Sequence, residues 1–479
     1  MQRLKPFIQG KFVASSSNCY LPDVNPSDAT DQIAEVPEGT ADDVKAAVAA
    51  ASEAFEAWRS RTGVARAEFL YRWAEVISSS QDALAQAVCR EVGKPISEAR
   101  GEEARGVAIL RYYAGQAVHP SGEVIPSQLE NALQFTLREP LGVVAVITPW
   151  NFPLAIPLWK LAPALAFGNA VVWKASELSP HVSTLLAETA AKVGLPPGVL
   201  NLVLGTGEGA GEALLQCDGV HALSFTGSSG VGAHIAGVAA HRGIRYQTEM
   251  GGKNAAIVLR DADLDRAASV TAAGAMRYAG QKCTATSRVI AAKEIAKTFW
   301  KKLETAIQAL PIGPVEDPKA AVGPLITEAS RNRLQQVRND LVAERIFEVP
   351  VPSDRYFTRG FFYPPTVVYG ARPDSFVGIN ELFGPVLVTF EAEDLDHAIE
   401  LVNRSKYGLS ATVFTRDLHS VLSYVRRIEA GMVRVNGDTT GVDPHAPFGG
   451  MKKSGSGSRE QGSAAREFYT EEKTIQIQG

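Results

Sequence analysis

Apolar residues recur at steps of three and four along two early segments of the chain, the spacing of one face of a helix. Thr40, Asp42 and Asp43 stand at the start of the first segment, and carboxylates there favour the positive end of a helix dipole. The pattern predicts mainly helical structure over the first hundred residues. The two apolar faces consist of Val44, Val48, Ala51, Phe55 and Trp58, and of Phe69, Leu70, Trp73, Val76 and Ile77.

The pattern changes at Leu141, where short apolar runs rich in β-branched residues replace the helical repeat. Helical segments separate these runs, as in a parallel sheet buried on both faces. A second set of such runs begins near Ala255 and continues past Phe414. We therefore predict an α/β protein with two doubly wound domains and a boundary near Glu249.

The stretch from Leu141 to Trp159 carries no charged residue and has the length of a membrane-spanning helix. Pro149, Pro153 and Pro157 interrupt it, however, and would break the hydrogen-bond ladder that such a helix needs. We interpret the stretch as a buried strand, a loop and the start of a helix.

Composition narrows the class of protein. A chain of 479 residues exceeds the size of one core, and a net charge of −4 gives no reason to expect nucleic acid or a membrane surface as partner. The four cysteines are scattered, which favours a reducing compartment over a disulfide framework and offers no metal site. No secretory signal is recognisable at the N-terminus, so we expect a cytoplasmic protein.

Candidate chemistry centres on Cys283, a lone cysteine in the stretch 280–284. An amide, Asn151, and two carboxylates, Glu249 and Glu381, accompany it, each close to glycine or proline. A nucleophile with an amide and carboxylates indicates covalent chemistry on a carbonyl. Taken alone, each has a simpler interpretation: Cys283 as a small buried side chain and Asn151 as a turn former.

The motifs together resemble the aldehyde dehydrogenase superfamily over essentially the whole chain. The resemblance implies that Cys283 is the nucleophile, that Asn151 and the Cys283 N–H stabilise the oxyanion, and that Glu249 is the general base. Lys160 matches a lysine that relays protons or sets the local field, although a lone lysine is usually a surface side chain. The matching stretches are 148–153, 225–232, 249–254, 280–284, 381–385 and 447–460.

A clean G-x-G-x-x-G fingerprint is absent, and Gly205–Gly209 has the wrong spacing. The loop 225–232 follows a predicted strand and opens a helix, where backbone N–H groups can bind an anion. The resemblance implies NAD or NADP, and Glu177 favours NAD because a carboxylate repels a 2′-phosphate. The implied cofactor-binding residues are Thr148, Pro149, Trp150, Lys174, Ser176, Glu177, Gly207, Phe225, Thr226, Gly227, Ser228, Gly251, Glu381 and Phe383.

Arg277 stands six residues before Cys283, where many family members have an aromatic residue. A guanidinium there suits a substrate carboxylate, unless it turns outward or pairs with a neighbouring acid. The stretches 280–289 and 458–462 resemble the branch that oxidises α-ketoglutaric semialdehyde (2,5-dioxopentanoate) to 2-oxoglutarate. Phe152, Trp159 and Phe448 complete the predicted substrate site.

The resemblance also implies the domain organisation. We predict a cofactor domain over 1–120 and 141–248, a catalytic domain over 249–448, and an oligomerisation arm over 121–140 and 456–479. Alternating residues at 128–137 and 473–478 fit such an arm, although a simple edge strand fits equally well. The arm implies a homodimer or a homotetramer. A general aromatic or aliphatic aldehyde dehydrogenase, a succinic semialdehyde dehydrogenase and a coenzyme A-acylating member remain alternatives.

Overall fold

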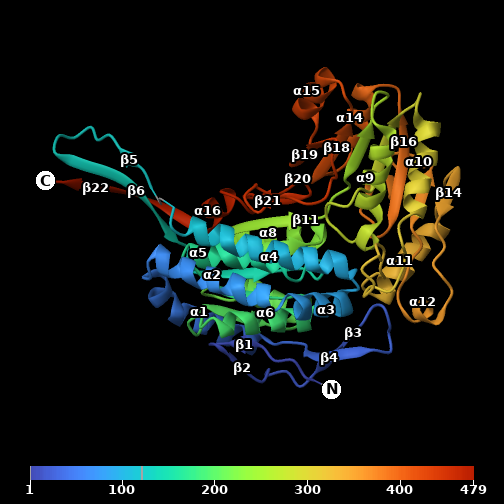
Figure 1. Ribbon diagram of the computed structural model, residues 1–479. Helices are drawn as coiled ribbons and strands as arrows, with labels where there is room; N and C mark the ends of the chain where they lie inside the picture. The colour runs from blue at the N-terminus through green and yellow to red at the C-terminus, as the bar shows by residue number, and fades with distance from the viewer. Residues whose placement is uncertain (1, 120–121) are drawn as a thin grey trace.

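A large sheet between two layers of helices forms the first half of the body of the computed structural model, which describes residues 2–119 and 122–479 (Figure 1). Neighbouring strands from β9 to β11 run parallel, while β1, β2 and β21 add antiparallel edges. Within the described residues the strand order is β2 (Lys11–Phe12), β1 (Phe7–Ile8), β9 (Leu200–Val203), β8 (Ala170–Lys174), β7 (Val143–Ile147), β10 (Ala222–Gly227), β11 (Arg245–Met250) and β21 (Gly455–Gly457).

Alternate residues of these strands enter two separate cores. Val144 and Val146 of β7 pack into one, whereas Val143 and Ala145 pack into the other, as the twofold period of a strand requires. Helices α5 (Ala155–Ala166) and α6 (Pro180–Lys192), backed by α2 (Gly63–Ser79), α3 (Gln81–Val92) and α4 (Ile96–Gln116), cover the first core; α1 (Ala41–Arg59), α7 (Glu212–Gln216) and α8 (Ser229–Arg242) cover the second.

The predicted helices are confirmed from Ala41 onward, whereas residues 7–37 form short strands that the apolar repeat did not predict. Helix α1 starts after Thr40, whose side chain accepts a hydrogen bond from the Asp43 N–H in a reciprocal capping box. The charge-free stretch consists of strand β7, a loop and the start of α5, as predicted. No helix in the described part of the chain is long and apolar enough to cross a membrane.

The second half is another sheet, flanked by its own helices. Strand β14 pairs antiparallel with β15, and the remaining neighbours are parallel. The strands are β14 (Arg345–Glu348), β15 (Thr366–Tyr369), β16 (Val386–Ala392), β13 (Arg288–Ala292), β12 (Ala255–Val258), β18 (Ser410–Phe414) and β19 (Met432–Val435), in that order; the helices include α9 (Leu264–Met276), α10 (Ala296–Gln308), α11 (Glu328–Asn339), α14 (Leu395–Asn403) and α15 (Leu418–Arg427).

A narrow arm projects from the first half and carries the C-terminus at its tip (Figure 1). Its sheet consists of β22 (Thr470–Gln478), β6 (Ala132–Pro140) and β5 (Val124–Ile125). One assignment needs correction: Gly455–Gly457, whose last two residues we assigned to the arm, pair with β11 of the large sheet. The predicted boundary at 120 and 121 lies outside the described residues, and the domain limits stay a prediction.

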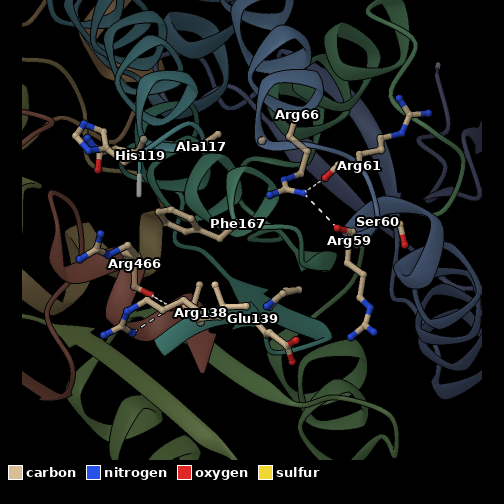
Figure 2. Close-up of a pocket in the computed structure, with 15 residues that line it drawn as sticks. Arg59, Ser60, Arg61, Arg66, Ala117, His119, Arg138, Glu139, Phe167 and Arg466 are labelled. Atoms are coloured by element: carbon tan, nitrogen blue, oxygen red, sulfur yellow. Dashed lines mark hydrogen bonds between the residues drawn. The ribbon is translucent and has the colours of Figure 1, made fainter. Parts of the chain in front are cut away.

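A basic cavity of about 450 Å³ lies at the base of the arm (Figure 2). Two of its arginine side chains form hydrogen bonds and ion pairs that hold secondary-structure elements together. The Nε–H of Arg66 donates to the Ala166 carbonyl at 2.8 Å and its Nη1 to the Arg59 carbonyl at 3.3 Å, so α2 is tied to the ends of α1 and α5. Arg138 of β6 forms an ion pair with Glu467, next to the start of β22.

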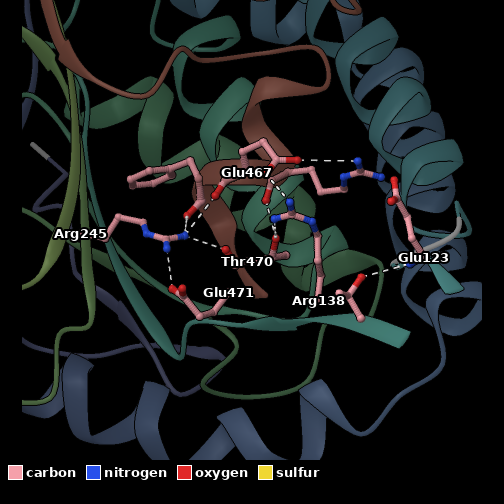
Figure 3. Close-up of polar contacts among 9 residues, drawn as sticks. Glu123, Arg138, Arg245, Glu467, Thr470 and Glu471 are labelled. Atoms are coloured by element: carbon pink, nitrogen blue, oxygen red, sulfur yellow. Dashed lines mark hydrogen bonds and ion pairs between the residues drawn. The ribbon is translucent and has the colours of Figure 1, made fainter. Parts of the chain in front are cut away.

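Arg245 fastens the C-terminal segment to the large sheet (Figure 3). Its Nη1 donates to the carbonyls of Glu467 at 3.0 Å, Phe468 at 3.1 Å and Thr470 at 2.6 Å, and its Nη2 pairs with Glu471. These carbonyls lie where α16 (Ala464–Tyr469) gives way to β22. One side chain thus satisfies several backbone acceptors where the body meets the arm.

Arg245→Ala should loosen this junction. Losing charge-assisted hydrogen bonds of this kind costs about 1.5–3 kcal/mol, so we expect a lower melting temperature and faster tryptic release of the C-terminal strand. Arg372→Ala is the matched control, because Arg372 is 81% exposed and pairs with Asp374 nearby in the chain. Equal digestion of the two variants, followed by mass spectrometry, would contradict this role of Arg245.

Candidate active site

The predicted cofactor residues gather where the order of the large sheet reverses. Strands β8 and β9 follow β7 on one side, whereas β10 and β11 lie on the other. Ligands of open α/β sheets bind outside the carboxyl ends of the strands at such a point. Thr148 follows β7, Lys174 ends β8, Gly227 ends β10 and Glu249 lies one residue before the end of β11.

Specific contacts hold three of the predicted cofactor residues in place. Thr148 Oγ1 accepts a hydrogen bond from the Trp173 indole at 2.8 Å, and Lys174 Nζ lies 3.0 Å from Glu177 Oε2. Ser228 caps the N-terminus of α8 by accepting from the Val231 N–H. Gly207 is the outlier: it opens η1 (Gly207–Gly211) after β9, two strands away from β7.

Cys283 lies in a tightly turned loop between the two halves. The turn before it, η2 (Arg277–Gly280), holds Tyr278 at φ 55° and Ala279 at φ 50°, left-handed conformations that cost energy for residues with a Cβ. Asn254 secures the loop from the other side, because its Nδ2 donates to the carbonyls of Cys283 at 2.8 Å and Ala285 at 2.9 Å. The surrounding structure thus enforces the position of the thiol.

Asn151 links the first half to this loop. Its Nδ2 donates to the Gln281 carbonyl at 3.0 Å, and its side chain is buried. Gln281 is itself held, since its Nε2 donates to the Pro324 carbonyl at 3.0 Å and its Oε1 accepts from the Ile326 N–H at 2.9 Å. A side-chain amide from the first half is therefore hydrogen-bonded to the backbone two residues before Cys283.

Glu249 is buried beside a second pair of charges. Its Oε2 accepts from the Gly450 N–H at 3.1 Å, and burial together with Glu460 raises the pKa of its carboxyl well above the ordinary value. Lys160 pairs with Glu460 and donates to Ser224 Oγ at 2.9 Å, with both charged side chains almost fully enclosed. A carboxylate with a raised pKa and a proton-carrying neighbour suits general-base chemistry.

Glu381 reaches the same region from the second half. Its Oε1 accepts from the Gly252 N–H at 3.1 Å, and burial raises its pKa to about 7. A Cβ at Gly251 would collide with its carboxylate, which explains a glycine at that position. Phe383, at φ 53°, packs edge-on against Trp150 with ring centroids 5.7 Å apart.

The surroundings of the Cys283 thiol disfavour its ionised form. Burial, followed by the negative charges of Glu381 and Glu249, raises the pKa of Cys283 to about 12. In the protein alone the group is therefore a thiol at neutral pH, and a nearby positive charge or a base is needed to form the thiolate.

A cavity of about 350 Å³ opens onto Cys283. The four side chains predicted for the substrate site all line it. Arg277 is 52% exposed and lies 3.7 Å from Glu98, which also accepts from Lys282 at 2.8 Å. Trp159 and Phe448 pack together with ring centroids 5.4 Å apart. The lining consists of Ser97, Glu98, Gly101, Glu102, Arg105, Phe152, Trp159, Arg277, Lys282, Cys283, Thr284, Thr440, Gly441, Val442 and Phe448.

Several residues of the site escaped the sequence analysis. Glu460 was visible only as part of a motif, and nothing marked its pairing with Lys160. Glu102 is buried and accepts from the N–H groups of Leu154 at 2.8 Å and Ala155 at 3.0 Å, so it holds the loop that carries Asn151. The available signal was a carboxylate, Glu102, at a position on the apolar face of a predicted helix. Burying a charged group without a partner costs free energy, so such a position indicates a specific partner.

Comparisons with known proteins agree with this architecture. The aldehyde dehydrogenase family profile matches residues 12–475. The chain is 42% identical to an α-ketoglutaric semialdehyde dehydrogenase of Bacillus subtilis (98% of this chain, 97% of that protein) and 38% identical to a 2,5-dioxopentanoate dehydrogenase of Saccharolobus solfataricus (97% of each). A crystal structure of Staphylococcus aureus betaine aldehyde dehydrogenase in complex with NAD⁺ superposes with a TM-score of 0.95 at 32% identity, covering 99% of this chain and 94% of that one.

The fold and the thiol site define an oxidoreductase that works through a nicotinamide dinucleotide. The chain belongs to the aldehyde dehydrogenase family, and it is an NAD(P)-dependent enzyme that oxidises aldehydes. The residues present fit such a cofactor. Thr226 Oγ1 is buried with no hydrogen-bond partner among the described residues, and a Cβ on Gly230 would meet nothing within 4 Å, which leaves space at the N-terminus of α8.

The charge effect on the thiol predicts a measurable change in reactivity. At pH 9 Glu381 is ionised, because its pKa is about 7, and it disfavours the thiolate. Glu381→Gln should therefore lower the thiol pKa and raise the rate of iodoacetamide labelling of Cys283, without cofactor, by about threefold or more. Glu391→Gln, an exposed change on strand β16, is the control. A labelling curve that does not move, or moves to higher pH, would refute this effect.

Proposed function

We propose that the protein oxidises a semialdehyde acid, α-ketoglutaric semialdehyde (2,5-dioxopentanoate), to 2-oxoglutarate through a covalent bond to Cys283. The observation that carries the proposal is the cavity beside Cys283, which combines apolar walls with cationic side chains. The names of the Bacillus subtilis and Saccharolobus solfataricus relatives support the same substrate.

The first chemical step joins substrate and enzyme. Once its proton has passed to a base, the thiolate of Cys283 adds to the aldehyde carbon, and the carbonyl oxygen becomes the oxyanion of a thiohemiacetal. The Asn151 amide and the Cys283 N–H donate hydrogen bonds to that oxygen; losing one such donor typically lowers turnover by about 10²–10³. The link from Asn151 to the Gln281 carbonyl keeps the amide close to the place where the charge develops.

The second and third steps release the product. A bound nicotinamide dinucleotide supplies the acceptor for the hydride that leaves the thiohemiacetal carbon, and a thioester remains on Cys283. Glu249 takes a proton from water, and the resulting hydroxide attacks the thioester carbon. The C–S bond then breaks, which releases the carboxylic acid and regenerates the Cys283 thiolate. Lys160 and Glu460 pass that proton onward, a role that their enclosed ion pair beside Glu249 supports.

The remaining predicted residues hold the dinucleotide. Lys174 and Glu177 would bind the adenosine ribose, and the loop 225–228 with the N-terminus of α8 would hold the pyrophosphate. Glu381 with Phe383 would hold the nicotinamide ribose. We infer a preference for NAD, because Glu177 stands 3.0 Å from Lys174 and would repel a 2′-phosphate. Thr148, Pro149, Trp150, Ser176 and Gly251 border this site, while Gly207 lies farther along the sheet.

The substrate side divides into apolar and charged parts. Phe152, Trp159 and Phe448 enclose the carbon chain, and Arg277 attracts the carboxylate at the mouth of the cavity. The acylating alternative passes the thioester to coenzyme A and needs no water-activating base, so the buried Glu249 favours hydrolysis. A general aromatic or aliphatic dehydrogenase is the alternative that differs only in the substrate cavity.

We further infer a cytoplasmic homodimer or homotetramer built through the arm. The arm exposes large apolar side chains, which include Leu133 at 50%, Ile477 at 54% and Val124 at 77% exposure. Exposed apolar groups gathered on one projecting sheet favour contact with another subunit.

The direct test is steady-state oxidation of α-ketoglutaric semialdehyde, succinic semialdehyde, benzaldehyde and hexanal with NAD and with NADP, without coenzyme A. We expect kcat/KM at least about tenfold higher for the carboxylated aldehydes, or roughly 1.4 kcal/mol of discrimination. Preference for benzaldehyde or hexanal would reject the substrate and leave the cysteine chemistry intact. Turnover that requires coenzyme A would reject hydrolysis.

Arg277→Ala should raise KM for the carboxylated aldehydes and leave that of hexanal unchanged. Because Arg277 is 52% exposed and close to Glu98, solvent screens its charge and we expect a change of about three- to tenfold. Arg404→Ala is the control, since Arg404 is exposed and pairs with Glu400. Equal effects of Arg277→Ala on hexanal and on the carboxylated aldehydes would refute the electrostatic role.

A further inference from the structure

A second arginine lies in the substrate cavity, on an element that the sequence motifs do not include. Arg105 belongs to α4, whereas Arg277 follows α9 of the other half. Both line the cavity that opens onto Cys283, together with Trp159 and Phe448. The guanidinium carbon of Arg105 lies 5.7 Å from the centre of the Trp159 ring, so an aromatic side chain holds the group beside the apolar wall.

The hydrogen-bonding capacity of Arg105 is only partly used. Its Nη2 donates to Gln461 Oε1 at 3.3 Å, whereas its Nε is buried and has no hydrogen-bond partner among the described residues. Burial lowers the pKa of the guanidinium from its ordinary value, although arginine stays charged at neutral pH. A buried donor of a charged group without an acceptor is costly, unless a bound molecule supplies that acceptor.

Nearby carboxylates have other partners or lie at longer range. Glu102, which acts most strongly on Arg105 among the charged neighbours, is paired with Lys94. Glu98 pairs with Lys282 and Arg277. Asp443 also acts on Arg105 through space without forming an ion pair within 4.0 Å, and the positive charge of Arg434 opposes its effect. The cavity therefore holds a guanidinium whose positive charge is incompletely matched by the protein.

We propose that Arg105 is a specificity-determining residue that binds the carboxylate of the semialdehyde acid inside the cavity, while Arg277 acts at the mouth. The inference rests on the proposed substrate and deepens it. A guanidinium presents neighbouring N–H groups in a plane, which matches the two oxygens of a carboxylate. Arg105 lines the cavity and keeps donor capacity that the described residues do not use, whereas Arg277 is more exposed and lies 3.7 Å from a competing acid.

The test compares Arg105→Gln and Arg105→Lys with the wild-type enzyme on α-ketoglutaric semialdehyde, glutaric semialdehyde and hexanal. For Arg105→Gln we expect kcat/KM to fall by about 10- to 100-fold on the two acids, with little change on hexanal. Arg105→Lys keeps the charge and should recover part of the loss. Arg111→Gln is the control, because Arg111 lies on the same helix and is 52% exposed beside Glu75.

A second readout needs no turnover. The product 2-oxoglutarate should slow iodoacetamide labelling of Cys283 in the wild-type enzyme and in Arg111→Gln, and this protection should disappear in Arg105→Gln. Protection that survives in Arg105→Gln would overturn the proposal.

The outcomes separate this proposal from the one on which it rests. A wild-type enzyme that prefers hexanal and is not protected by 2-oxoglutarate would reject the semialdehyde substrate and the Arg105 anchor together. A wild-type preference for acids that Arg105→Gln retains would reject the anchor alone. An equal loss on all three aldehydes with a lower melting temperature would make Arg105 a packing residue, which also rejects the anchor.

Discussion

The hydrogen bond from the Asn151 amide to the Gln281 carbonyl joins the two halves of the candidate active site. Asn151 follows a strand of the large sheet, whereas Gln281 precedes Cys283 in a loop of the second half. The supports of this bond lie on both sides: Glu102 holds the loop after Asn151, and Asn254 holds the carbonyls around Cys283. Because covalent catalysis requires near-contact geometry, the fold must fix both partners before a substrate arrives.

Exclusion of water is the second constraint. The site places Cys283, Glu249 and Glu381 in one buried region, and burial raises the pKa of all three. Burial thus disfavours the charged form of each group, and the raised pKa makes the Glu249 carboxylate a stronger base. Lys160, which is paired with Glu460, places a positive charge near Glu249 that partly offsets the rise in its pKa. The burial that disfavours the thiolate thus also raises the basicity of Glu249.

Local patterns predicted much of the fold. The apolar repeats located α1 and α2, and the prolines correctly argued against a membrane helix at 141–159. The short apolar runs identified the central strands because a buried parallel sheet leaves little room for polar residues. The return of Gly455–Gly457 to the large sheet was missed, since so short a strand has no periodicity of its own.

Local motifs indicated candidate site residues from the sequence alone. Ion pairs between residues far apart in the chain could not be predicted in this way. Cys283, Asn151, Glu249 and Glu381 stand in recognisable turns. Lys160 pairs with Glu460, which lies 300 positions later in the chain. Arg105 lines the cavity from helix α4, whose sequence pattern shows only an apolar and a polar face. Such contacts depend on how the halves pack, which a hydrophobic pattern along the chain does not encode.

The most direct test of the account is acid quenching of the Glu249→Gln variant during reaction with NAD and α-ketoglutaric semialdehyde, followed by peptide mass spectrometry. We expect a burst of about one reduced cofactor per active site and an acyl adduct on the peptide that contains Cys283. Sustained turnover in that variant, or reduced cofactor formed without an adduct on Cys283, would contradict it.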